Sequence, residues 1–235
     1  MTDPQPLRLD YDDPVFRHGT EAHALDHSIL RPEFSDVHPY VADRLAQEAN
    51  GPVLDLGCGP AKLGKLLTAR SVPWTGLDQS PTRLRLGEGP RVLGDACHLP
   101  FADATFGAVA TLYTLYHFAD PIVPMREAHR TMRPGAVFVT CAPSAFDDPE
   151  LAKFLPPRVP ETFDSDSGPA MVARVFRDVE VKRWEMPLMR FPNAEGVWNY
   201  LVAHMLEPDA ASEAAAKLSY PFWLTKRGAT IWARK

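Results

Sequence analysis

The stretch VLDLGCGPA, residues 53–61, decides the fold of this chain. A strand-like run ends at Leu56, and a helical pattern occupies Ala61–Arg70 directly after the glycines. Gly57 and Gly59 allow a sharp turn between the two and leave space where a ligand can lie against the backbone. Such a turn lies at the carboxyl end of a strand, where open α/β sheets bind ligands.

The rest of the chain continues this alternation of strand and helix. A first helix is predicted within residues 31–50, where apolar residues recur every fourth position from Val37 to Ala49. We expect strands at 53–56, 74–77, 91–93, 108–112, 136–141, 179–191 and 224–234, and helices at 61–70, 122–133 and about 194–206. This order favours a mostly parallel sheet wrapped by helices, with the last two strands antiparallel at its edge.

Composition narrows the class of protein. The chain has 235 residues, 25 Lys and Arg against 30 Asp and Glu, and a net charge of −5, which argues against a nucleic-acid partner. Its three cysteines show no C-x-x-C spacing, so neither a zinc site nor a disulfide framework is expected. The start lacks the features of a secretory signal, and no apolar run is long enough to span a membrane. We therefore expect a cytoplasmic protein without membrane contact, and composition leaves its oligomeric state open.

Two nucleotide-type ligands compete for the glycine turn. A dinucleotide site needs G-x-G-x-x-G or A, whose third small residue would fall at position 62. That position holds Lys62, so the dinucleotide fingerprint fails. An acidic residue inside the strand, Asp55, is also foreign to that pattern.

VLDLGCGPA instead resembles the first motif of class I S-adenosylmethionine-dependent methyltransferases of the type 11-like, small-molecule kind. In that family an acidic residue precedes G-x-G-x-G, and Ala61 stands here in place of the last glycine. LPFADATF at 99–106 and Arg133-Pro134-Gly135 also match family motifs, whereas Gly107 replaces a usual acidic residue. The resemblance covers about residues 50–142. It implies an α/β fold with a Rossmann-like, mostly parallel seven-stranded sheet, helices on both faces and antiparallel last strands.

The resemblance implies S-adenosyl-L-methionine as cofactor and S-adenosyl-L-homocysteine as product. Asp78 ends the second strand, where a carboxylate can accept hydrogen bonds from both ribose hydroxyls. Asp95 would accept from the adenine amino group, and the Ala96 N–H would face a ring nitrogen. Structural roles in turns or helix caps remain the alternative for Asp55, Asp78 and Asp95. The residues expected at the cofactor are Asp55, Gly57, Cys58, Gly59, Pro60, Asp78, Gln79, Asp95, Ala96, Leu112 and Tyr113.

Catalytic candidates follow the fourth strand, in TLYTLYH at residues 111–117. Methyl transfer from a sulfonium is an in-line displacement, which needs a base only where the nucleophile must lose a proton early. His117 has a pKa range suited to that role, and Tyr116 lies beside it in the sequence. The alternative is a histidine packed at a strand–helix junction.

Two segments are candidate lids over the substrate. The N-terminal one would use Tyr11, Phe16 and His18, and the proline-rich one at 143–169 would use Phe146 and Arg158. Ordinary surface loops are the alternative for both. No metal site is expected, because no third ligand accompanies His23 and His27.

These observations predict a single methyltransferase domain over residues 1–235. Its parts would be an N-terminal lid and first helix (1–50), a cofactor-binding core (51–142), a substrate lid (143–178) and C-terminal edge strands with a helix (179–235). The predicted function is methyl transfer to an O or N atom, or a C atom, of a small organic acceptor. A catalytically silent, cofactor-binding regulatory subunit is one alternative, and a nicotinamide-dependent oxidoreductase, disfavoured by Lys62, is another.

Overall fold

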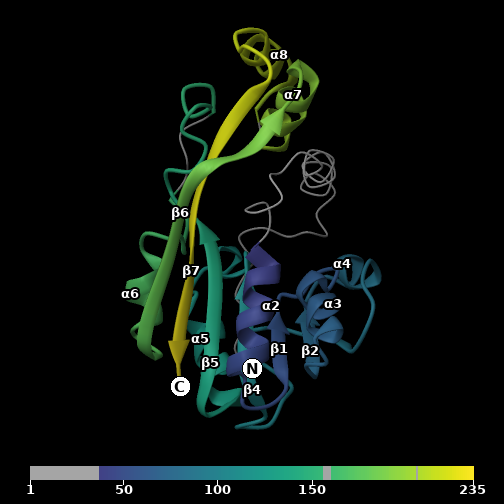
Figure 1. Ribbon diagram of the computed structural model, residues 1–235, viewed down its shortest axis with the longest axis vertical. Helices are drawn as coiled ribbons and strands as arrows, with labels where there is room; N and C mark the ends of the chain where they lie inside the picture. The colour runs from purple at the N-terminus through teal and green to yellow at the C-terminus, as the bar shows by residue number, and fades with distance from the viewer. Residues whose placement is uncertain (1–36, 156–159, 205) are drawn as a thin grey trace.

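A seven-stranded sheet runs through the molecule in the order β3-β2-β1-β4-β5-β7-β6 (Figure 1). The computed structural model describes residues 37–155, 160–204 and 206–235. β1, β2, β3, β4 and β5 pair in parallel, and β7 pairs antiparallel with both β5 and β6. The fold predicted from the sequence is thereby confirmed. The strands are β1 Val53–Leu56, β2 Trp74–Asp78, β3 Arg91–Leu93, β4 Phe106–Leu112, β5 Met132–Pro143, β6 Arg177–Phe191 and β7 Phe222–Arg234.

β1 lies where the order of the strands reverses. β1 pairs with β2 on one side and with β4 on the other, and every residue of β1 and β4 is buried. Parallel strands buried on both faces require continuous apolar runs, which these two segments have apart from Asp55 and Thr111. A reversal of strand order opens a crevice at the carboxyl ends of the strands, and ligands of open α/β sheets bind in it. The topology therefore singles out the turn after β1.

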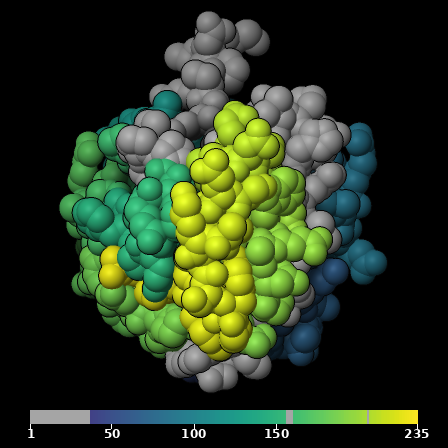
Figure 2. Space-filling view, turned by 90° about the horizontal axis from the view of Figure 1, so that it is seen from above, coloured from purple at the N-terminus to yellow at the C-terminus, as the bar shows by residue number. Residues whose placement is uncertain are grey.

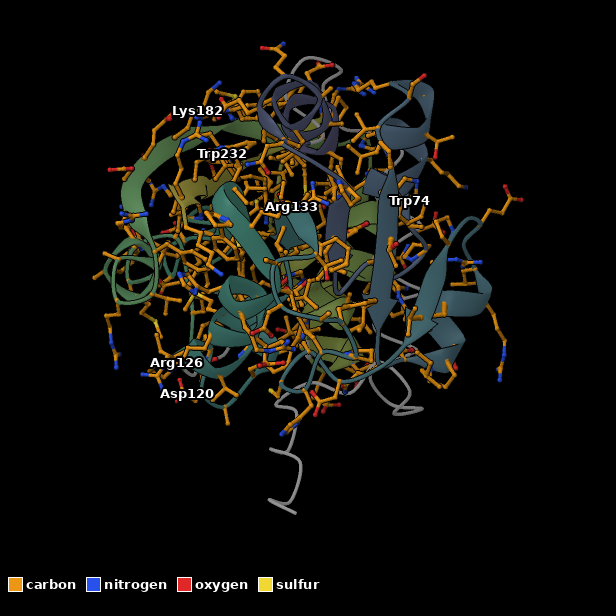
Figure 3. All side chains as sticks on the ribbon, turned by 90° about the horizontal axis from the view of Figure 1, so that it is seen from below. Trp74, Asp120, Arg126, Arg133, Lys182 and Trp232 are labelled. Carbon is orange, nitrogen blue, oxygen red and sulfur yellow. The ribbon has the colours of Figure 1, made fainter. Side chains whose placement is uncertain are left out.

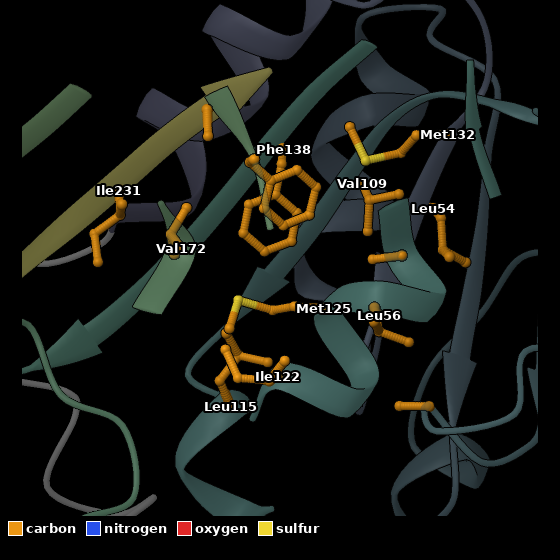
Figure 4. Close-up of a cluster of buried hydrophobic side chains, with 14 of the residues drawn as sticks. Leu54, Leu56, Val109, Leu115, Ile122, Met125, Met132, Phe138, Val172 and Ile231 are labelled. Atoms are coloured by element: carbon orange, nitrogen blue, oxygen red, sulfur yellow. The ribbon is translucent and has the colours of Figure 1, made fainter. Parts of the chain in front are cut away.

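Helices cover both faces of the sheet. Alternate residues of β5 point to opposite faces, so Val139 packs with Leu45 of α2, whereas Phe138 packs with Met125 of α5. Phe138 also stacks on Phe176 at 4.1 Å between ring centroids; Figure 4 shows Phe138 among the apolar side chains of this face. No helix within the described ranges is long and apolar enough to cross a membrane. The helices are α2 Val37–Glu48, α3 Lys62–Ala69, α4 Pro81–Arg85, the 3-10 helix η2 Leu115–His117, α5 Ile122–Thr131, α6 Gly168–Val172, α7 Ala194–Ala203 and α8 Pro208–Ala216.

Aromatic side chains mark the two halves of the sheet. Figure 3 shows Trp74 of β2 and Trp232 of β7 on opposite sides of the molecule, with Lys182 of β6 beyond Trp232. The guanidinium of Arg44 in α2 lies 4.2 Å from the Trp232 ring, and the Lys182 ammonium lies 4.0 Å from the Tyr40 ring. These cation–π contacts fasten α2 to the antiparallel strands.

Gly107 explains one departure from the family pattern. A Cβ atom at this position would lie 2.5 Å from the Asn50 carbonyl carbon and from the Gly51 Cα. The Gly107 N–H also donates to the Pro52 oxygen at 2.8 Å. Because the connection from α2 to β1 crosses so closely, no side chain fits at position 107, and an acidic residue is excluded there.

α7 and α8 form a small core of their own with the ends of β6 and β7, beyond the main sheet (Figures 1 and 2). Leu151, Phe191, Tyr200 and Leu224 are among its buried residues. The helix predicted at about 194–206 is α7, whose first turn the Asn193 side chain caps by accepting from the Gly196 N–H. α8 is not among the predicted helices; its buried face consists of alanines, Ala211, Ala214 and Ala215, which give a weaker apolar signal than larger side chains.

A buried ion cluster attaches this small core to the segment that follows β5. The Lys226 ammonium of β7 contacts the carboxylates of Asp147 and Asp148, the latter at 2.6 Å. The Tyr200 hydroxyl donates to Asp148 at 2.8 Å, and the Arg227 N–H donates to Asp147 at 2.6 Å. Both carboxylates are almost fully buried, so the lysine is their charge partner inside the protein.

Substituting Lys226→Met is expected to lower the free energy of unfolding by about 3–5 kcal/mol, since two buried carboxylates lose their cation. Urea denaturation at pH 7 measures this. Lys217→Met is the control, because Lys217 is exposed and lies 3.8 Å from an exposed Glu213; it should change stability by less than about 0.5 kcal/mol. Equal losses in both variants would show that the cluster contributes nothing specific.

Candidate functional site

The turn after β1 has the backbone conformation that its glycines permit. Gly57 has φ +76° and Gly59 has φ +47°, both in the left-handed region. A Cβ on Gly57 would collide with the Thr114 side chain that follows β4, so only glycine fits there. A Cβ on Gly59 would find its nearest side-chain atom, the Arg83 Nε, 3.8 Å away. The neighbour of Gly59 on this side is therefore the end of a flexible arginine side chain, at ordinary van der Waals distance.

The Asp78 carboxylate joins this turn to the end of β2. One oxygen accepts the Gly59 N–H at 2.8 Å, and the other accepts the Ser80 N–H at 2.9 Å. Each carboxylate oxygen can accept a second hydrogen bond, and Asp78 is only half-buried. Asp78 is thus fixed in position and still able to accept two hydroxyl groups, as the expected contact with a ribose requires.

Asp55 is a buried carboxylate next to the turn. It is 4% exposed, and its Oδ2 has no hydrogen-bond partner among the described residues. Burial, and then the charge of Asp78, raise the pKa of Asp55 to about 7, against a smaller lowering by a hydrogen bond from the Gly64 N–H. Since buried polar atoms are normally hydrogen-bonded, this oxygen marks a place for a cationic or hydrogen-bond-donating ligand group.

The loop after β3 brings Asp95 and Ala96 to the same edge of the sheet. Asp95 accepts the Cys97 N–H at 2.8 Å, and its second oxygen lies 3.1 Å from the His98 Nδ1. Its carboxylate therefore serves its own loop and retains part of its accepting capacity. Ala96 is buried, whereas Gln79 at the end of β2 is exposed.

Two residues of α5, neither of them predicted as a site residue, hold the connector between β3 and β4. Glu127 accepts the Leu99 N–H at 2.9 Å, and the Arg130 guanidinium donates to the Leu99 and Phe101 oxygens at 3.0 and 2.9 Å. The Arg130 hydrogen bonds hold the pKa of Glu127 below its usual value. Their spacing of three on one helix face is the only signal in the sequence, and it does not reveal the partner loop.

The end of β4 has an unusual backbone conformation. Tyr113 has φ +54°, which is uncommon for an aromatic residue, and its N–H donates to the Cys141 oxygen at 2.9 Å. Its ring centroid lies 6.4 Å from that of His38 in α2. Leu112 just before it is buried. Strained residues of this type gather at functional sites, and the placement of Leu112 and Tyr113 beside the cofactor stays a prediction.

Tyr116 and His117 lie together in η2. Their ring centroids are 4.6 Å apart, and the His117 N–H donates to the Thr114 oxygen at 3.0 Å. His117 is 6% exposed, whereas Tyr116 is half-buried. The pair therefore borders the same loop that packs on Gly57, with the imidazole in the protein interior.

The remaining predicted site residues are two in the glycine turn and those of the two predicted lids. Cys58 is buried in the glycine turn, and burial raises the pKa of its thiol, which leaves it protonated; Pro60 beside it is half-buried. Phe146 lies just after β5 and is 69% exposed. The other predicted lid residues lie outside the described part of the chain: Tyr11, Phe16, His18 and Arg158.

Sequence comparisons agree with this geometry. Residues 54–140 match a family described as a methyltransferase domain. The chain is 37% identical over 92 residues to demethylmenaquinone methyltransferase of Mycobacterium sp. (strain KMS), covering 38% of this chain and 40% of that protein. It is 36% identical over 105 residues to methyltransferase GfsG of Streptomyces halstedii, covering 40% and 38%. The matches thus span about two fifths of the length of these curated relatives.

Solved structures share the fold over most of the chain. The YcgJ protein from Bacillus has a TM-score of 0.60 at 18% identity, covering 83% of this chain and 98% of that one. A SAM-dependent methyltransferase from Archaeoglobus fulgidus has a TM-score of 0.56 at 18% identity, covering 86% and 96%. With the sequence matches, these likenesses confirm the resemblance to the class I S-adenosylmethionine-dependent methyltransferase superfamily.

Asp55 should make stability depend on pH. Its pKa is about 7 in the folded protein and near 3.8 when unfolded, so the folded state binds more protons between these values. Stability should then fall by about 4 kcal/mol as pH rises from about 4 to about 7, and level off above that.

Urea denaturation of wild type and of Asp55→Asn at pH 4, 5.5, 7 and 8 measures this difference. The variant lacks the titrating group, so its stability relative to wild type should increase up to pH 7. A constant difference across the series would show that Asp55 ionises normally.

Proposed function

We propose that this protein transfers a methyl group from S-adenosyl-L-methionine to an O or N atom, or a C atom, of a small organic molecule. The observation that carries the proposal is the Asp78 carboxylate bonded to the Gly59 N–H at the point where the strand order reverses. This hydrogen bond joins a backbone turn that can receive a ligand to a carboxylate that can accept hydrogen bonds from the hydroxyls of a sugar.

The residues present fit this cofactor. Gly57 and Gly59, with Cys58 and Pro60 between and after them, would lie along its amino-acid half, where the Asp55 oxygen lacks a partner among the described residues. Asp78 and Gln79 would hold the ribose, Asp95 and Ala96 the adenine, and Leu112 and Tyr113 would flank the bound molecule. When bound, the cofactor supplies a methyl group made electrophilic by a positively charged sulfur. The protein's part is to hold the acceptor in line with that group and to exclude water.

A small-molecule acceptor is supported by several observations. One relative is named for demethylmenaquinone, and the chain carries a net charge of −5, which suits a nucleic acid poorly. We place the acceptor beyond Tyr113, and its lids would come from the part of 1–50 that precedes α2 and from the exposed residues of 143–178, such as Phe146; Asp147, Asp148 and α6 of the second segment are packed into the fold. A single domain over 1–235 and a cytoplasmic location belong to the same proposal. A silent cofactor-binding subunit would share every feature described, so activity must be measured separately.

Isothermal titration of the full chain with S-adenosylhomocysteine and with NAD tests the cofactor. We expect micromolar binding of the first and none of the second. Asp78→Ala should weaken binding about 10- to 150-fold, since hydrogen bonds to charged groups contribute about 1.5–3 kcal/mol. Asp103→Ala is the matched control, because Asp103 is 77% exposed and pairs with Arg130 in the connector.

Binding of NAD, or unchanged affinity in a folded Asp78→Ala protein, would overturn the cofactor assignment. Transfer of a radiolabelled methyl group to a panel of hydroxylated, aminated and quinone-type acceptors then tests catalysis. Tight cofactor binding without transfer to any acceptor would favour the silent subunit.

His117, with Tyr116, is our proposed base, and a packing role is the alternative. If His117 removes a proton, His117→Asn should lower kcat at least tenfold and remove the acidic limb of the pH profile, with cofactor affinity unchanged. Tyr116→Phe, which keeps the ring, separates a hydroxyl role from packing. An unaltered pH profile in His117→Asn, with lowered thermal stability, would assign the buried imidazole to packing.

A further inference from the structure

A cavity lies on the antiparallel side of the sheet, away from the glycine turn. It has a volume of about 200 Å³ and is lined by residues of β6, of β7, of the segment after β5 and of the segment before α6. α6 packs beside β6 and β7 (Figure 1). β7 is three strands from β1, about 14 Å at ordinary strand spacing. The side chains that matter in it are Ser144, Ser165, Asp166, Arg183, Glu185 and Arg227.

Two donor atoms of residues that line this cavity are buried in its wall and have no hydrogen-bond partner among the described residues. The Ser165 side chain is 1% exposed, and its hydroxyl is one of them. The Arg227 Nε is the other, although the Nη1 and Nη2 of the same guanidinium donate to the Phe146 oxygen and to Glu185. A buried donor without an acceptor is costly, so both point to a ligand that accepts hydrogen bonds.

The carboxylate of Asp166 does not supply that acceptor, because the segment after β5 and Arg183 of β6 already use it. Asp166 accepts the Ser144 hydroxyl at 2.6 Å and the Ala145 N–H at 3.2 Å, and it lies 3.3 Å from the Arg183 Nη1. Arg183 also donates to the Ser165 oxygen at 2.8 Å, which fixes its guanidinium at the rim. Asp166 therefore fixes the start of the segment after β5 and the guanidinium of Arg183.

Glu185 is a replaceable partner of Arg227. Its side chain is 62% exposed, and exposed ion pairs contribute little to stability. An incoming anion could take its place on the guanidinium, and a small side-chain shift at the cavity wall would bring it to the buried Arg227 Nε and Ser165 hydroxyl, which Glu185 leaves without a partner. Guanidinium groups bind carboxylates and phosphates in this forked manner.

We propose that this cavity binds the acidic group, a carboxylate or a phosphate monoester, of a small molecule. Its volume holds such a group with a few further atoms and is below that of pockets for drug-sized ligands. The group belongs either to a free small anion or to the acidic end of a longer molecule. The site does not depend on the proposed methyl transfer.

Titration of the ¹⁵N-labelled full chain with inorganic phosphate, acetate and octanoate tests the proposal, with sodium chloride at matched ionic strength as reference. We expect saturable shifts of the Arg227 Nε–H and Ser165 amide signals with phosphate or a carboxylate. Tighter binding of octanoate than of acetate would identify the end of a longer molecule, and equal binding a free anion; both support the site.

Three variants test whether the named residues bind the anion. Ser165→Ala should weaken binding about tenfold, because one hydrogen bond to an anion is lost. Glu185→Gln should strengthen it about two- to fivefold, because the competing carboxylate is removed. Ser212→Ala, an exposed serine of α8, should change nothing.

Absence of saturable shifts, identical shifts with chloride, or equal affinity in Ser165→Ala and wild type would overturn the proposal. The same samples are also titrated with S-adenosylhomocysteine. Because this titration tests the proposed cofactor site alone, a failure of the anion site can be told apart from a failure of the proposed methyl transfer.

Discussion

The architecture of the candidate site depends on the bridge that Asp78 makes between two turns. Its carboxylate accepts one N–H from the glycine turn after β1 and one from the start of the next helix, at 2.8 and 2.9 Å. β1 and β2 pair in parallel register, so their carboxyl ends meet, and the bridge locks the two loops that emerge there. Without it, neither the left-handed backbone at Gly59 nor the direction of the Asp78 side chain would be fixed. Both the shape and the polarity of the candidate site follow from this contact.

The two halves of the sheet serve different purposes. The parallel half contributes short buried strands whose loops carry polar groups at one edge. The antiparallel half extends beyond the main sheet, and its buried ions and small apolar core support α7 and α8 there. This division gathers the polar groups of the proposed cofactor site in the parallel half. The cavity at Arg227 and Ser165 lies in the antiparallel half, and neither residue belongs to the proposed cofactor site.

Local sequence was sufficient to predict most of the fold. β1 occupies the predicted residues 53–56. A short apolar run followed by glycines is typical of a buried strand that ends in a turn, so the sequence alone predicted it. Asp78 was predicted from its place at a strand end, although its bond to Gly59 was not. α4 and η2 were missed because segments of five and three residues show no periodicity.

The contacts that escaped prediction join residues far apart in the chain. Lys226 reaches Asp148 across 78 positions, and Asp166 reaches Ser144 across 22. No local pattern encodes such pairings, since each residue alone looks like an ordinary surface charge or hydroxyl. The glycine at position 107, where the family has an acidic residue, is likewise explained by a residue far away in the chain, because Gly51 approaches it closely.

The most direct measurement is the response of individual backbone amides of the full chain to S-adenosylhomocysteine, followed by ¹H–¹⁵N correlation spectra. The account predicts large, saturable shifts at Gly57, Gly59 and Ser80, with Ser165 and Asp166 unchanged. Saturable binding that leaves the two glycine signals in place, or no binding at all, would contradict it.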